Sequence, residues 1–227
     1  MSKHNIRVEL TPKTTAELII RSEIDLFDGW GQGQARQVLD EILNLPIDTL
    51  LSIVDGVFTS VPIGTDNIPQ FGKIENVVRV PQIMLEEKAL QVDFVELGFL
   101  MKKDPTATMA SNQKFGENHG KVASQIGIIT CVGTRFVPSV ISDSFVNNYD
   151  EEQKMDIATK LFIRVPIIRA LLRDAKDRQL NGYDYMNLLE RSTKERRGSS
   201  IRTILKSLKR FGNDELDRRI DSVTWEL

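Results

Sequence analysis

Two polar helix faces carry the residues best suited to contact nucleic acid. The later face lies in residues 192–210, where cations and hydroxyls can bind phosphates and base edges of double-stranded DNA. Its candidate contacts are Lys194, Arg196, Arg197, Ser199, Ser200, Arg202 and Lys206. The earlier face lies in residues 117–126, and with two flanking cations its candidate contacts are Lys114, Asn118, His119, Lys121, Gln125 and Arg135. Either face could instead be an ordinary solvated helix surface.

An acidic motif suggests a different chemistry. Asp66 is followed downstream by Glu86-Glu87-Lys88. Two carboxylates that hold Mg²⁺, with a lysine that positions the attacking water, make the metal site of many restriction-type nucleases. Because Glu86 and Lys88 lie in a helical pattern and not in a strand, a magnesium-dependent nuclease is the alternative and not the main hypothesis.

The remaining reactive side chains are too few for most catalytic sites. One cysteine and two histidines cannot build a zinc finger, an iron–sulfur cluster or a disulfide framework within one chain. Neither His4 nor His119 has an obvious nucleophile and orienting acid nearby in the sequence. Cys131 follows an apolar run and is predicted to be a buried structural thiol. We therefore expect no catalytic residue, no bound metal and no cofactor.

The elements that must position these residues are mostly helical. Apolar spacing predicts helices at 14–28, 35–43, 47–57, 82–101, 122–126, 153–178, 183–190 and 199–210. Pro166 should interrupt the helix at 153–178. In the helix at 199–210 the buried stripe is Ile201, Ile204, Leu205 and Leu208. Thr14 with Glu17, and Ser192-Thr193 with Glu195, are spaced as helix caps.

The order of these elements indicates a winged helix. The helix at 82–101 is followed by the helix at 122–126 and by two short strands within 128–137. Residues 61–81, rich in proline and glycine, are predicted to be a loop or irregular hairpin and a domain boundary. The last twelve residues could supply a terminal strand or wing.

The same region resembles a known class of proteins. The run ELGFLMKKD…KFGENHGKVASQIGIITCVGTRFVPS, then LFIRVPIIRALLRDA, resembles tandem winged-helix DNA-binding modules associated with bacterial restriction and defence systems. The run ERSTKERRGSSIRTILKSLKRFG resembles the recognition segment of the second module. The residues that match its pattern are Ser192, Thr193, Arg196, Arg197, Ile201, Arg202 and Ile204. The chain departs from the pattern at Leu205 and Leu208, where aromatic residues are usual, and in the end-of-wing segment at Ser139 to Ser144.

Charge is distributed unevenly along the 227 residues. Residues 1–159 carry 14 Lys and Arg against 22 Asp and Glu, whereas residues 160–210 carry 14 against 5. This asymmetry indicates that the later segment contacts a polyanion. The acidic part repels DNA, so we expect it to serve dimerisation or a protein partner.

The sequence predicts a mainly α protein with short β-hairpins. It should consist of an acidic helical N-terminal unit at 1–80, a first winged-helix module at 82–150 and a second, basic winged-helix-like module at 151–227. The expected function is non-catalytic binding of double-stranded DNA, in transcription regulation or in a restriction or defence complex. A scaffolding subunit whose basic helix docks an acidic protein is a further alternative. The apolar runs are too short to span a bilayer and no signal peptide is recognisable, so we expect a cytoplasmic protein without membrane contact.

Overall fold

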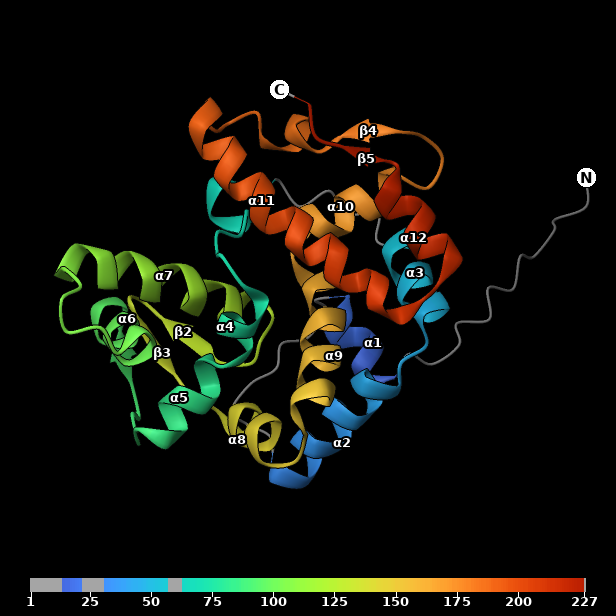
Figure 1. The fold of residues 1–227 in the computed structure, drawn as a ribbon. Coiled ribbons are helices and arrows are strands. Elements are labelled where there is room, and N and C mark those ends of the chain that lie inside the picture. The colour runs from blue at the N-terminus through green and yellow to red at the C-terminus, as the bar shows by residue number, and fades with distance from the viewer. Residues whose placement is uncertain (1–13, 22–30, 57–62, 227) are drawn as a thin grey trace, which may run out of the picture.

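The computed structural model describes residues 14–21, 31–56 and 63–226, without the side chain of Asp66 (Figure 1). The chain is mainly helical and contains a small three-stranded antiparallel sheet. The predicted class, mainly α with short β-hairpins, is therefore confirmed. The described part contains no helix that is long and apolar enough to cross a membrane.

Three short helices form the N-terminal part. They are α1 (Thr15–Ile20), α2 (Gln32–Asn44) and α3 (Ile47–Gly56). The predicted cap at Thr14 is confirmed, because Glu17 N donates to Thr14 Oγ1 at 3.2 Å and Thr14 N donates to the Glu17 carboxylate at 2.9 Å. Most of the second half of the helix predicted at 14–28 falls outside the described residues.

The chain between residues 63 and 102 differs from the prediction. Its elements are a 3-10 helix (η1, Thr65–Asn67), α4 (Ile74–Val78), α5 (Val80–Glu86), β1 (Val92–Asp93) and α6 (Phe94–Lys102). Residues 74–78 form a helix and not a hairpin, since Ile74, Val77 and Val78 gather on one buried side. The single helix expected at 82–101 is broken where Lys88 takes a left-handed conformation with φ 51°. Asp93 then caps α6 through the amides of Val95 and Glu96.

The predicted hairpin follows a long helix. The elements are α7 (Met109–Gln125), β2 (Thr130–Val132) and β3 (Arg135–Val137). Strands β2 and β3 pair antiparallel with Cys131 opposite Phe136, and β1 pairs with the other edge of β3, so the sheet order is β1-β3-β2. The Phe136 ring is fully buried and packs against Phe94 with ring centroids 5.2 Å apart.

The C-terminal half is built from five α-helices and two short strands. They are α8 (Val140–Asn147), α9 (Glu151–Leu161), α10 (Pro166–Asp174), β4 (Leu180–Asn181), α11 (Arg191–Leu208), α12 (Asp214–Asp221) and β5 (Val223–Thr224). Short 3-10 helices join them at η2 (Phe162–Arg164), η3 (Gly182–Met186) and η4 (Lys209–Phe211). The predicted interruption at Pro166 is confirmed, since this residue begins α10.

One C-terminal prediction is wrong and another is confirmed in part. Helix α11 begins at Arg191 with Glu190 as its cap residue, so Ser192 and Thr193 lie inside the helix. The tail forms helix α12 and then strand β5, so a terminal strand is present as predicted, over residues 223–224 alone. Strand β5 pairs parallel with β4, and the described residues 151–226 contain no antiparallel hairpin.

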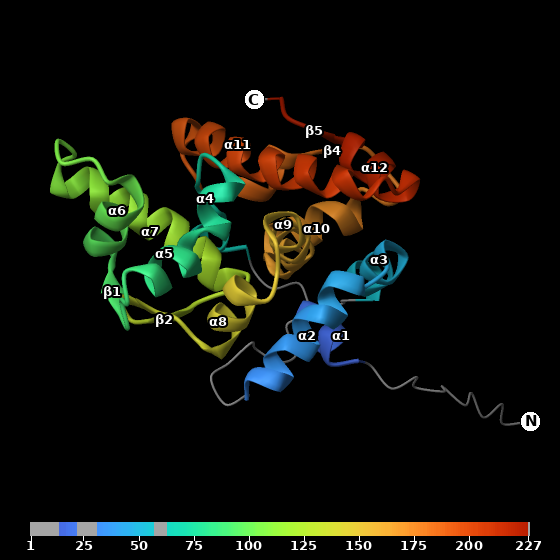
Figure 2. The ribbon, with the colours of Figure 1, turned by 60° about the horizontal axis from the view of Figure 1, so that its bottom comes forward.

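One hydrophobic cluster joins these elements. Helices α9 and α10 lie at the centre, where α9 contacts α2, α4 and α11, and α10 contacts α3, α11 and α12 (Figures 1 and 2). The predicted α11 stripe is confirmed, because Ile201, Ile204, Leu205 and Leu208 are all buried. The cluster runs through all three expected units, and their boundaries near residues 80 and 150 stay a prediction.

Candidate nucleic-acid interface

Helix α7 is held at close range against α6. A Cβ atom added at Gly98 would lie 1.9 Å from the carbonyl oxygen of Asn112, and one added at Gly116 would lie 2.0 Å from that of Phe94. Both distances are far below van der Waals contact, so only glycine allows the two backbones to approach this closely. The crossing fixes which face of α7 is turned away from α6.

The outward face of α7 carries most of the residues expected there. Lys114 is exposed, and Asn118, Lys121 and Gln125 are partly exposed. His119 was expected to face outward as well, and the structure corrects this, because its side chain is only 3% exposed. The imidazole is held through Nδ1 at 2.8 Å from the carbonyl oxygen of Phe115.

The structure brings part of both predicted faces to one recess of about 60 Å³. Helix α7, the chain after η1 and the first half of α11 form its walls. The lining residues are Ile68, Pro69, Gln70, Lys114, Glu117, Asn118, Lys121, Val122, Gln125 and Arg197. Five of the thirteen candidate contacts are among them, although they are up to 83 residues apart in the sequence. Glu117 and residues 68–70 were not predicted to belong to the interface, because only the packing of α11 on this loop places them here.

The recess carries a net positive charge, and one carboxylate neutralises part of it. The Lys121 ammonium lies 2.8 Å from the Glu117 carboxylate. This hydrogen bond, with further attraction from Lys114 and Arg197, holds the pKa of Glu117 below its ordinary value despite partial burial. The carboxylate therefore stays ionised, and three cations surround one anion. The arrangement can attract a phosphate, and it has no group placed for covalent chemistry.

Two residues expected to contact DNA from α11 form hydrogen bonds within the protein. Ser200 is 1% exposed, and its hydroxyl donates to the carbonyl of Phe71 at 2.8 Å and accepts from the amide of Phe71 at 2.9 Å. The Arg197 guanidinium donates to the carbonyls of Thr65 and Ile68, the second at 2.7 Å. Both side chains attach α11 to residues 65–71. Ser200 is buried there, contrary to its expected exposure, whereas Arg197 remains partly exposed and lines the recess.

The other α11 candidates remain at the surface. Arg196 and Ser199 are exposed, with Arg196 bonded within its own helix to Ser192 and Thr193. Arg202 is exposed and lies over the Trp225 ring at 5.3 Å. Lys206 is also exposed, and Lys194 is partly exposed and donates to Asn187. Arg135, on β3, is exposed and lies outside the recess.

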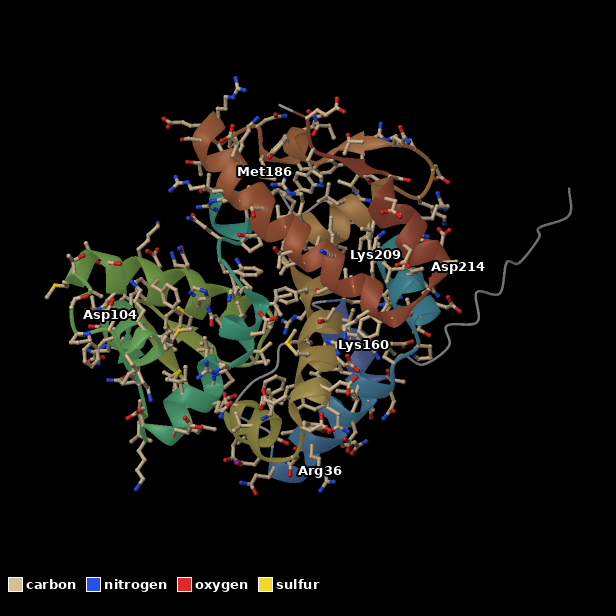
Figure 3. All side chains as sticks on the ribbon, in the orientation of Figure 1. Arg36, Asp104, Lys160, Met186, Lys209 and Asp214 are labelled. Carbon is tan, nitrogen blue, oxygen red and sulfur yellow. The ribbon has the colours of Figure 1, made fainter. Side chains whose placement is uncertain are left out.

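Many of the cations in residues 160–210 are buried or form ion pairs within the fold. Lys160 is 5% exposed and donates to the carbonyls of Leu43 and Leu45, and burial lowers its pKa (Figure 3). Arg169 is 7% exposed and donates to the carbonyls of Arg21 and Arg164. Further cations form ion pairs with acids in five places: Arg173–Asp174, Lys176–Asp55, Arg191–Glu195, Lys209–Asp221 and Arg210–Asp156. The excess of positive charge counted from the sequence is thus larger than the excess that remains at the surface.

The alternative metal site is not assembled in the described part of the chain. Glu86 accepts a hydrogen bond from the side chain of Gln82 at 2.8 Å, and Lys88 is exposed in the turn after α5. The side chain of Asp66 is not among those that the structure describes. Among the described residues, no group of three His, Cys, Asp or Glu could hold a metal ion. Cys131 is only partly buried, and that burial raises the pKa of its thiol.

The buried position of His119 predicts a pH-dependent stability. Burial lowers the pKa of His119 below 6.5, its ordinary value. As pH falls below about 6.5, the unfolded chain binds the proton first, so the free energy of unfolding should decrease until the folded-state pKa is reached. Binding of one proton changes the free energy of unfolding by at most about 1.4 kcal/mol per pH unit. Denaturant unfolding at about pH 7, 6 and 5 should show this slope, and His119→Gln should remove it. Equal slopes in the two proteins would contradict the assignment of the pH dependence to His119.

Comparisons with known proteins add no assignment. No family model, no curated protein and no solved structure matches this chain.

Proposed function

We propose that this chain is a non-catalytic protein that binds double-stranded DNA, with residues 80–137 as a winged-helix module. The observation that carries the proposal is the order α5, β1, α6, α7, β2, β3 together with the sheet order β1-β3-β2. A winged helix has this order, with the long third helix as the element that enters the major groove. In this chain that helix is α7.

The side chains of α7 and of the hairpin support the same proposal. Lys114, Asn118 and Lys121 extend along the outward face of α7, and Arg135 lies on the exposed hairpin. Amide side chains can bind adenine edges, and lysine and arginine can bind guanine edges or phosphates. Arg196, Arg202 and Lys206 on α11 would contribute phosphate contacts. A role in transcription regulation or in a restriction or defence complex follows from the sequence resemblance alone.

Charge-matched variants test the proposal. The double variant Lys114→Ala/Arg135→Ala should weaken binding to a random duplex of about 30 base pairs roughly 10-fold at about 50 mM salt and reduce the salt slope by about 2. Arg196→Ala/Arg202→Ala should weaken it less. The control is Arg36→Ala/Arg218→Ala, which removes two exposed cations that already pair with Asp40 and Glu215 on their own helices.

Fluorescence anisotropy of a labelled duplex, at about 50 and about 200 mM salt, gives both quantities. Equal losses in all three variants would mean that only the overall charge matters. If the unmodified chain does not bind at the lower salt, DNA binding by this chain alone is excluded, and the α11 face becomes a candidate docking surface for an acidic protein.

A further inference from the structure

A second hollow among the described residues lies on the other side of the α6–α7 pair. It is a groove of about 580 Å³, which is within the range of about 300–1,000 Å³ typical of ligand sites. All of its lining residues fall within 89–112: Ala89, Gln91, Val92, Val95, Glu96, Phe99, Leu100, Ala107, Met109 and Asn112. We call this the α6 groove. It belongs to one continuous segment, and no later element lines it.

Exposed apolar side chains concentrate at the α6 groove. The described residues include five large hydrophobic side chains that are strongly exposed, and Leu90, Phe99 and Met109 are three of them, at 83%, 54% and 73%. Phe99 and Met109 line the groove, and Leu90 stands between two residues that do. A contiguous apolar patch of this kind marks an interaction site more often than single exposed residues do.

Two hydrogen-bond acceptors at the groove bear on what it can bind. Asn112 is only 5% exposed, and its Oδ1 has no hydrogen-bond partner among the described residues. A buried acceptor without a partner costs about 1–3 kcal/mol, which a donor entering the groove would recover after a rotation of the amide. Glu96 is the only charged residue in the lining; its carboxylate is exposed and accepts one bond, from the amide of Asp93.

We propose that the α6 groove binds a basic amphipathic helix of a partner protein. Apolar side chains of that helix would cover Phe99 and Met109, as in other helix-in-groove complexes. Its lysine or arginine side chains would pair with Glu96 and donate to Asn112. Charge decides between possible occupants, because an acidic helix would place its carboxylates against the Glu96 carboxylate.

The α6 groove lies beside the close crossing of α6 and α7. A Cβ atom added at Gly98 would lie 1.9 Å from the carbonyl oxygen of Asn112, which is one of the lining residues. The Lys102 ammonium donates to the Ser111 hydroxyl at 2.6 Å and ties the C-terminal end of α6 to the start of α7. A preformed groove loses little conformational entropy on binding. The site is independent of the proposed DNA-binding face, which lies on the opposite side of α7.

The test uses the full chain with ¹³C-methyl methionine and a synthetic peptide of leucine and lysine at helical spacing, about 14 residues long. The peptide should shift the Met109 methyl resonance with a Kd of about 10–100 μM. The buried Met186 methyl, beside α11, is the internal control (Figure 3). Phe99→Ser should weaken the peptide about 10-fold, and Glu96→Gln, which keeps the acceptor for Asp93, about 3-fold.

Leu188→Ser is the matched control, since Leu188 is 76% exposed and does not line the groove. This variant should bind the peptide like the unmodified chain. Four outcomes would overturn the proposal: an unmoved Met109 methyl, equal affinity for a peptide with glutamate in place of lysine, unchanged affinity in both groove variants, or a Met109 shift caused by raising the protein concentration alone. The last result would identify a second copy of this chain as the occupant.

Discussion

Gly98→Ala is expected to destabilise the protein by about 3 kcal/mol or more. The new methyl group would lie 1.9 Å from the carbonyl oxygen of Asn112, which is backbone and cannot rotate away. Helices α6 and α7 must therefore move apart, which loosens the packing of Phe94 on Phe136. For a chain of this length each kcal/mol corresponds to about 2–4 °C, so the melting temperature should fall by about 6–12 °C.

Thermal and denaturant unfolding measure this effect directly. Gly116→Ala should behave similarly, because its Cβ atom would lie 2.0 Å from the carbonyl oxygen of Phe94. Gly33→Ala is the control, since no atom lies within 4 Å of its added Cβ. There the smaller entropy of the unfolded chain should leave stability unchanged or raise it by up to about 1 kcal/mol. A loss below about 1 kcal/mol in Gly98→Ala would show that the helices do not cross this closely.

Ser200→Ala is expected to cost about 2–4 kcal/mol, whereas Ser199→Ala should change stability by less than about 0.5 kcal/mol. The Ser200 hydroxyl bonds both the amide and the carbonyl of Phe71, a residue that is only 7% exposed. Without that hydroxyl, two buried backbone groups lose a partner. Ser199 is the next residue on the same helix, and its side chain is exposed.

The same pair of variants separates a structural role from a role in binding. Both are neutral substitutions, so neither changes the electrostatic attraction to DNA. For Ser200→Ala, DNA affinity corrected for the folded fraction should equal that of the unmodified chain. A specific loss of DNA affinity in Ser200→Ala with unchanged stability would contradict the buried bonds to Phe71 and restore Ser200 as a phosphate contact.

Periodicity in the sequence was sufficient for the elements with a one-sided apolar pattern. The α11 stripe, the start of α10 at Pro166, the Thr14 cap and the strands near residues 130 and 136 all follow from neighbours within a few positions. Residues 74–78 were misjudged as a hairpin. Their β-branched side chains favour a strand locally, but burial of Ile74, Val77 and Val78 on one side of a helix outweighs that preference.

The candidate interface was less predictable than the elements. Its polar residues were identified, but exposure depends on which face each helix buries, and that is decided by distant partners. His119 is turned inward because α7 crosses α6 at glycines, and Ser200 is turned toward Phe71, 129 residues away in the sequence. The α6 groove was not anticipated, since Phe99 and Met109 have the spacing and composition of ordinary core residues.

The charge of the protein was likewise predictable from the sequence in its amount but not in its location. The sequence by itself determined a mainly α chain, the apolar stripes of its helices, and an excess of cations in residues 160–210. Only the tertiary structure decided where those cations act. Lys160 and Arg169 bind backbone carbonyls in the interior, and Lys176 and Arg210 pair with carboxylates from other elements. A net charge is a property of composition, whereas a surface potential depends on which charges the fold leaves in contact with water.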